Sequence, residues 1–195
     1  MILIVDLCGE RGSLSRFEFV HPVSAIVGGA GEMAGTVHLS DLSLAACRAA
    51  DGIVLCGTAI KDHAWQGLLG ELDWLRNVRT PVLGICAGSQ LIAALHGGKV
   101  TPWPVIGMQQ TTVLEDDEVL GKERSFEAYH LHNLGPSLPP GFRLLAGTED
   151  RAEAFRHPER QLWGVLFHPE VRNEWIVKDF VGICRNGSGA VVGKT

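Results

Sequence analysis

Over its first hundred residues, the chain alternates short apolar runs with segments of helical spacing. Three runs are continuous and rich in β-branched residues, ILIVD (2–6), GIVLCG (52–57) and PVLGIC (81–86). Such runs are typical of strands buried on both faces of a parallel sheet. Apolar residues at helical spacing predict helices over 42–51, 63–78 and 87–98. We therefore expect an α/β fold with a mostly parallel sheet covered by helices on both faces.

After residue 100 the pattern becomes a succession of short apolar runs separated by glycine, proline and charged turns. These runs predict strands over 105–115, 126–132, 142–147, 152–156 and 161–167. A helical pattern returns over 175–184, and the remaining residues, 185–195, have the composition of a flexible tail. The pattern predicts one domain over 1–184 and gives no indication of a second.

Composition narrows the class of protein. The chain has 195 residues and a net charge of −5, with no basic run, which argues against a nucleic acid or an anionic membrane as the main partner. No segment has the composition of a secretory signal or a membrane span. The five cysteines are widely spaced without a CxxC pair, as expected for reduced thiols. We expect a cytoplasmic protein.

The candidate nucleophile is Cys86, in the sequence Gly84-Ile85-Cys86-Ala87-Gly88 between a predicted strand and a predicted helix. This is the thiol form of the G-x-S-x-G nucleophile elbow, a tight turn that projects its central side chain from the sheet edge. The start of the helix favours a thiolate, and the N–H of Ala87 would face an oxyanion. The other four cysteines are expected to be buried structural residues.

A general base for Cys86 can come from one of two His-Pro-Glu tripeptides. His157-Pro158-Glu159 lies in a polar stretch typical of a hairpin turn, whereas His168-Pro169-Glu170 directly follows a predicted buried strand. Since reactive groups gather at the carboxyl ends of parallel strands, we assign the base to His168. In an extended segment residues i and i+2 share a side, which would let Glu170 orient the His168 ring.

The remaining histidines have structural interpretations. His130 and His132 could ligate a metal together with His168, but no cysteine or carboxylate cluster accompanies them, so a strand end near the pocket is the preferred interpretation. His21, His38, His63 and His96 have the pattern of isolated surface or capping positions. We expect neither a metal nor a cofactor.

The stretches DGIVLCG, PVLGICAGSQLIAALHGGKV and LWGVLFHPEV together resemble class I (triad-type) glutamine amidotransferases, from 2–6 to about Cys184. The resemblance implies hydrolysis of the side-chain amide of L-glutamine through a γ-glutamyl thioester, with ammonia released to a synthetase. It implies a three-layer α/β sandwich with a central, mostly parallel sheet and a flavodoxin-like core. It also implies a triad of Cys86, His168 and Glu170. The part after residue 100 is most similar to the glutaminase part of GMP synthases. Since 195 residues leave no room for a nucleotide-activating domain, the synthetase is expected to be a separate subunit.

The resemblance also implies substrate-binding residues, and this sequence departs from the family's pattern at two places. Gly57 matches the first glycine of the oxyanion loop, whose N–H would join that of Ala87, and Gln90 matches a glutamine that positions the substrate. The family commonly has Gly-Gly-Pro-Gly in that loop, whereas this chain has Gly57-Thr58-Ala59-Ile60. Thr58 tolerates positive φ poorly, so we expect the loop to follow a different path. The family's histidine before the elbow glutamine is Ser89 here.

Three hypotheses follow. The chain is a glutaminase that supplies ammonia, a hydrolase of other γ-glutamyl amides or peptides, or a non-catalytic module that keeps the fold. The intact triad favours an enzyme, and the altered 57–60 loop motivates the second hypothesis.

Overall fold

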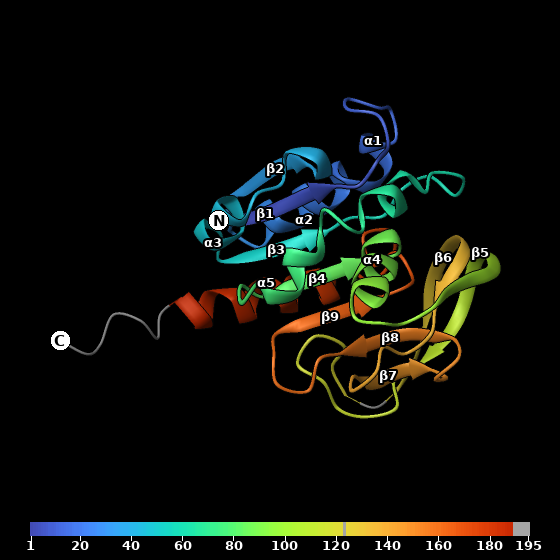
Figure 1. Ribbon diagram of the computed structural model, residues 1–195. Helices are drawn as coiled ribbons and strands as arrows, with labels where there is room; N and C mark the ends of the chain where they lie inside the picture. Colours follow the sequence, from blue (N-terminus) through green and yellow to red (C-terminus); the bar gives the residue numbers. More distant parts are fainter. Residues whose placement is uncertain (123, 189–195) are drawn as a thin grey trace.

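The computed structural model of the chain describes residues 1–122 and 124–188. Its largest element is a seven-stranded sheet with the strand order β2-β1-β3-β4-β9-β8-β7 (Figure 1). The strands from β2 to β9 in this order are parallel, and β8 and β7 are antiparallel to their neighbours. The strands are β1 (Ile2–Asp6), β2 (Ala34–His38), β3 (Gly52–Leu55), β4 (Val82–Ile85), β7 (Arg143–Gly147), β8 (Ala152–Arg156) and β9 (Leu162–Val165).

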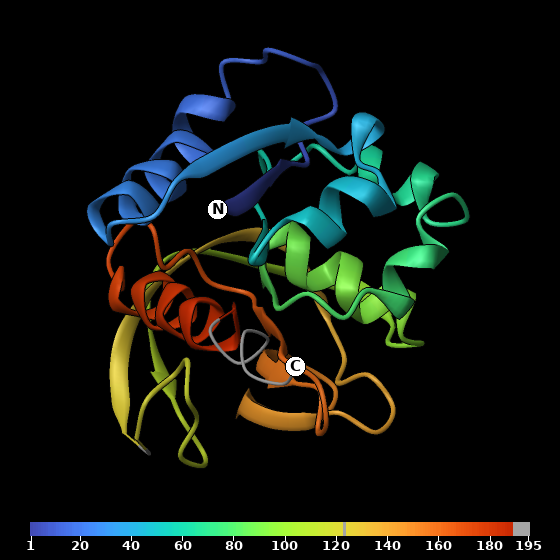
Figure 2. The same ribbon diagram turned by 90° about the vertical axis from the view of Figure 1, so that its left-hand side faces the viewer.

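Helices cover both faces of this sheet, as Figure 2 shows edge-on. The helices are α1 (Arg16–Phe19), α2 (His21–Gly29), α3 (Leu44–Ala49), α4 (Ala87–Leu95) and α5 (Trp175–Ser188). Alternate residues of a strand face opposite sides, so Ile4 packs in one core cluster with α2 and α5, and Val5 packs in another with α3 and α4. The predicted three-layer α/β architecture is confirmed.

A long hairpin forms a second, two-stranded sheet. Its strands, β5 (Val100–Thr112) and β6 (Ser125–Pro136), are antiparallel and lie at the end of the molecule toward which the parallel strands point (Figure 1). All five strands predicted after residue 100 are present, and three of them extend the main sheet. The hairpin therefore lies at the edge where the candidate catalytic residues were expected.

The helix predicted over 63–78 is wrong. This segment forms two short 3₁₀ helices, Ala64–Leu68 and Asp73–Asn77. Gly67 and Gly70 lie in the middle of the pattern, and glycine in a helix interior costs about 1 kcal/mol relative to alanine. The apolar residues of the segment are nevertheless buried, since Trp65 and Leu72 pack in the same core cluster as α4.

The C-terminal helix is longer than expected. The pattern predicted a helix over 175–184, and α5 continues to Ser188. The rest of the expected tail, 189–195, lies outside the described residues. Within the described residues, no helix is long and apolar enough to cross a membrane.

Candidate active site

Three neighbouring parallel strands bring the candidate residues to one edge of the sheet. Cys86 comes directly after β4, Gly57 comes two residues after the end of β3, and His168 comes three residues after the end of β9. Because β4 pairs with β3 on one side and with β9 on the other, their carboxyl ends lie side by side. The strand order thus positions Cys86 between the other two.

Cys86 occupies a strained turn directly before α4. It is the one non-glycine residue of the described chain with positive φ (φ 47°, ψ −105°), and its N–H donates to the carbonyl of Val165 at 2.8 Å. The two elbow glycines are required by close packing. A Cβ on Gly84 would lie 2.6 Å from the carbonyl oxygen of Gly88, and a Cβ on Gly88 would lie 2.2 Å from that of Leu55. Strain of this kind is typical of functional turns.

His168 and Glu170 form a buried hydrogen-bonded pair. Their Nδ1 and Oε1 atoms are 2.8 Å apart, and both side chains are 1% exposed. The expectation of an extended segment is wrong, because the N–H of Val171 donates to the carbonyl of His168 and closes a turn. The contact is nevertheless made, and it leaves the other ring nitrogen, Nε2, without a hydrogen bond in the described part of the chain.

Gly57 contacts both the histidine and the cysteine. A Cβ on Gly57 would lie 2.7 Å from Cε1 of His168 and 3.4 Å from Cβ of Cys86. Burial opposes a charge on His168, but the nearby carboxylate of Glu170 and the thiol group of Cys86 outweigh it and raise the pKa of His168 well above its usual value. The arrangement therefore favours an imidazolium beside a thiolate.

The other cysteines lack such an environment. Burial raises the pKa of the Cys47 thiol to about 11 and that of Cys184 to about 12, and it also raises the pKa values of Cys8 and Cys56. No disulfide links any of the five cysteines, all of which are buried and lie in the described part. Cys86 is the cysteine whose thiol group contributes to the raised pKa of the buried His168.

A narrow pocket lies above Cys86. It is lined by Thr58, Ala59, Ile60, His63, Cys86, Ala87, Gln90, Leu131, His132 and Asn133, and its free volume of about 10 Å³ is enough for one water molecule. Gln90 and Ala87, both predicted to bind substrate, lie in this lining, and Nε2 of Gln90 donates to the carbonyl of Leu134 at 3.0 Å. An amide side chain is larger than this free volume.

The loop after Gly57 is closed by a side-chain hydrogen bond, and whether its path differs from that of the family stays a prediction. The Thr58 hydroxyl donates to the carbonyl of Asp62 at 2.9 Å and holds the loop closed. His63 is the N-cap residue of the 3₁₀ helix Ala64–Leu68, as its interpretation as a capping position predicted, and it also lines the pocket, which was not predicted. Ser89 is fully buried, and its hydroxyl donates to the carbonyl of Cys86 at 2.7 Å.

His130 and His132 form a buried pair on β6. Nδ1 of His132 is 2.8 Å from the carbonyl of Trp103 and Nε2 is 3.1 Å from Nδ1 of His130, so each bond fixes a neutral tautomer. Burial lowers both pKa values to about 4. No group of three or more His, Cys, Asp or Glu side chains in the described residues is arranged to hold a metal. His132 lines the pocket instead.

The first His-Pro-Glu copy lies elsewhere, in the turn between β8 and β9. The His157 ring packs against Phe142, with ring centroids 5.1 Å apart, and its Nδ1 accepts from the N–H of Glu159. His96, beyond the end of α4, is a further neighbour. The assignment of this copy to a hairpin turn is confirmed.

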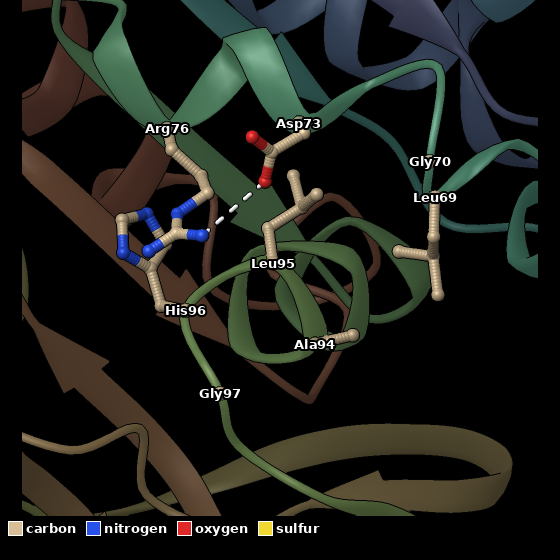
Figure 3. A pocket seen from close by; sticks show the side chains of 8 residues that line it. All are labelled: Leu69, Gly70, Asp73, Arg76, Ala94, Leu95, His96 and Gly97. Carbon is tan, nitrogen blue, oxygen red and sulfur yellow. Dashed lines mark hydrogen bonds and ion pairs between the residues drawn. The ribbon is translucent and has the colours of Figure 1, made fainter.

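A larger cavity of about 720 Å³ lies at the end of α4 remote from Cys86 (Figure 3). Its charged lining consists of Asp73 and Arg76, which form an exposed ion pair with each other, beside His96. None of the residues around Cys86 lines this cavity. Size alone therefore does not identify the reactive site.

The fold and these residues define a class of protein: an α/β enzyme with a Cys-His-Glu arrangement at a nucleophile elbow. A sequence model of the family "Glutamine amidotransferase class-I" matches residues 36–176. The chain belongs to the class I glutamine amidotransferase family, whose members include glutamine-hydrolysing enzymes.

Similar proteins include several that are named as subunits of glutamine-hydrolysing GMP synthase. The one from Methanothrix thermoacetophila is 39% identical over 145 residues, which span 70% of this chain and 78% of that relative. The one from Sulfolobus acidocaldarius is 36% identical over 122 residues. These residues span 58% of this chain and 65% of that relative, which is less than two thirds of its length. A crystal structure of a candidate GMP synthase subunit from Thermoplasma acidophilum has a TM-score of 0.82 and 25% identity, covering 97% of this chain and 96% of that one.

Proposed function

We propose that this chain is a glutaminase subunit that hydrolyses the side-chain amide of L-glutamine and delivers ammonia to a separate synthetase subunit. The observation that carries the proposal is the buried His168–Glu170 pair beside Cys86, at the carboxyl edge of the sheet. The similarity to proteins named as GMP synthase subunits supports GMP synthesis as the acceptor reaction.

In the first half of the reaction, the Cys86 thiolate attacks the amide carbon and a C–S bond forms. The oxyanion that develops would accept from the backbone N–H groups of Gly57 and Ala87. When the C–N bond breaks, the imidazolium of His168 gives its proton to the leaving nitrogen. Ammonia departs, and a γ-glutamyl thioester remains on Cys86.

In the second half, neutral His168 takes a proton from water while the oxygen of that water attacks the thioester carbon. The C–S bond breaks, glutamate leaves, and the thiolate–imidazolium pair is restored. Glu170 keeps the ring in the tautomer that presents Nε2 to the reacting atoms and stabilises the imidazolium. Gln90 would position the bound glutamine from the pocket wall.

A docking face for the synthetase is supported by exposed apolar side chains around this site. Ile106 is 67% exposed and pairs in register with Leu131, whose carbonyl oxygen is 3.7 Å from Sγ of Cys86. Val171 is 56% exposed and follows Glu170. Phe17 is 62% exposed, two residues from Phe19, whose ring centroid is 5.5 Å from that of His168. We define Phe17, Ile106 and Val171 as the apolar rim.

The absence of disulfides among the five cysteines fits a reducing compartment and supports the cytoplasm as the location. Neither a nucleic acid nor a membrane is part of the proposal.

One observation favours a second candidate function, hydrolysis of other γ-glutamyl amides or peptides. The Thr58 bond to Asp62 and the presence of His63 give the pocket a wall unlike the glycine-rich loop common in the family. Turnover of γ-glutamyl peptides at a higher kcat/KM than free glutamine would select this function over ammonia supply.

The direct test is glutamate release from glutamine, measured with the chain alone and with its candidate synthetase subunit. We expect release by the wild-type chain and a loss of at least about 10³-fold in Cys86→Ala, since removal of a nucleophile costs orders of magnitude in kcat. Cys47→Ala, at another buried cysteine, is the matched control and should retain activity. Equal activity in wild type and Cys86→Ala would overturn the proposal.

A further inference from the structure

A third cavity is lined by Glu170, the carboxylate of the proposed triad. It has a volume of about 370 Å³ and lies between α2 and α5, two helices that share one face of the sheet (Figure 2). Its lining consists of Pro22, Ala25, Ile26 and Gly29 from α2, together with Glu170, Glu174 and Lys178. It shares no residue with the pocket above Cys86. We refer to it as the rear pocket.

Glu170 is the link between the rear pocket and the reaction. Its side chain is 1% exposed, and Oε1 accepts from His168. Its second oxygen, Oε2, is buried and has no hydrogen-bond partner among the described residues. Buried carboxylate oxygens are almost always satisfied, so a donor supplied from outside the chain would complete this one.

The charges of the rear pocket favour a cation. Glu170 and Glu174 contribute two carboxylates, and Lys178 contributes one ammonium, whose Nζ is already 2.8 Å from Oε2 of Glu174. The α2 residues in the lining are uncharged. The pocket therefore has an excess of one negative charge, and its volume lies within the range of small-molecule sites.

The apolar part of the lining restricts the ligand further. Pro22, Ala25 and Ile26 offer a hydrocarbon surface opposite the carboxylates. A short alkyl chain with a terminal ammonium or guanidinium matches both halves, because its N–H groups can donate to carboxylates while its carbons cover the helix.

We propose that the rear pocket is a regulatory site for a small organic cation, an alkylammonium or guanidinium, which acts on the triad through Glu170. A cation beside Glu170 competes with the imidazolium of His168 for the same carboxylate. Its binding would weaken the thiolate–imidazolium pair without any contact with glutamine. The proposal rests on the proposed catalytic roles of these residues, but binding and thiol reactivity test it without glutamine turnover.

The other ionisable groups that face His168 and Glu170 do not add a positive charge that could compete with the imidazolium for Glu170. They are Cys86 at the start of α4, Cys56 after β3, and Tyr129, His130 and His132 on β6, with the Tyr129 ring centroid 6.4 Å from that of His168. Burial keeps the Cys56 thiol and both β6 histidines uncharged near neutral pH, since it raises the first pKa and lowers the other two to about 4. A bound cation would thus be the one new charge near the pair.

The test measures the rate of Cys86 alkylation by iodoacetamide against pH, with and without millimolar propylammonium or guanidinium chloride at constant ionic strength. We expect the upper inflection of the profile, where the imidazolium loses its proton, to move to lower pH by about one unit. Thermal unfolding should show a higher Tm with either cation and no change with sodium. An unmoved profile and an unmoved Tm with both cations would overturn the proposal.

Two variants of α2 distinguish an effect specific to the rear pocket from the general effect of an added positive charge. Ala25→Arg puts a guanidinium at the pocket. It should move the upper inflection of the alkylation profile to lower pH without added cation, and added cation should then have no further effect. Gly28→Arg is the matched control, since Gly28 is exposed on α2, has open space around it and does not line the pocket. Equal shifts in both variants would contradict a specific site. If Ala25→Arg does not fold, the wild-type response decides the outcome.

Discussion

At the scale of single residues, the two His-Pro-Glu copies show that context decides chemistry. His168 follows a central parallel strand and is 1% exposed beside Cys86, whereas His157 lies in a hairpin turn against Phe142. We expect His168→Asn to reduce kcat for glutamine hydrolysis by at least about 10²-fold, because it removes the general acid and base. His157→Asn should keep kcat within about twofold. Steady-state kinetics on both variants checks this, and equal losses would contradict the assignment.

Sequence alone was sufficient for Cys86, His168 and Glu170 to be proposed as one group, since the carboxyl ends of parallel strands share an edge. It was not sufficient to place His63 in the lining of the pocket. The pattern around His63 gives no sign of its position, because the path of the loop depends on the non-local fold and on one hydroxyl, that of Thr58.

At the scale of elements, continuous apolar runs identified β1, β3 and β4, since strands buried on both faces leave little choice of residue. The prediction of one helix over 63–78 is wrong. The apolar spacing suits a helix, but Gly67 and Gly70 destabilise a continuous helix. Period alone cannot distinguish an α-helix from two 3₁₀ turns that bury the same side chains. The α2 and β2 elements were not predicted.

The β5–β6 hairpin contains a pH-sensitive pair. Burial lowers the pKa values of His130 and His132 to about 4, below their unfolded value of 6.5. The unfolded state therefore binds more protons between these pH values, so the free energy of unfolding falls as pH drops from about 6.5 to about 4. Each histidine contributes a loss of roughly 3 kcal/mol at most.

Denaturant unfolding at several pH values measures this dependence. His130→Phe removes one of three histidines, with His132 and His96, whose pKa values burial lowers to about 4, so it should reduce their joint contribution to the slope by about a third. His21→Phe, at an exposed position on α2, is the control and should leave the slope unchanged. Parallel curves for the wild type and His130→Phe would contradict the role of the buried pair.

At the scale of the whole molecule, the apolar rim and the closed pocket have a common explanation. The pocket above Cys86 has room for one water, and Phe17, Ile106 and Val171, each a neighbour in sequence or in strand pairing of a residue at the site, are exposed. A synthetase subunit that covers this rim would keep released ammonia out of bulk water. The few hot-spot residues near the centre of an interface cost about 2 kcal/mol or more when they are truncated, and we expect Ile106 to be one of them.

We therefore expect Ile106→Asp to weaken binding of the synthetase subunit by about 30-fold, which corresponds to about 2 kcal/mol. Met33→Asp is the matched control. Met33 is 72% exposed, but it precedes β2 and so lies at the opposite edge of the parallel sheet. Titration calorimetry with the candidate synthetase gives both affinities. If the two variants bind equally well, the synthetase does not dock on the rim, and if only Met33→Asp loses affinity, it docks at the other edge of the sheet.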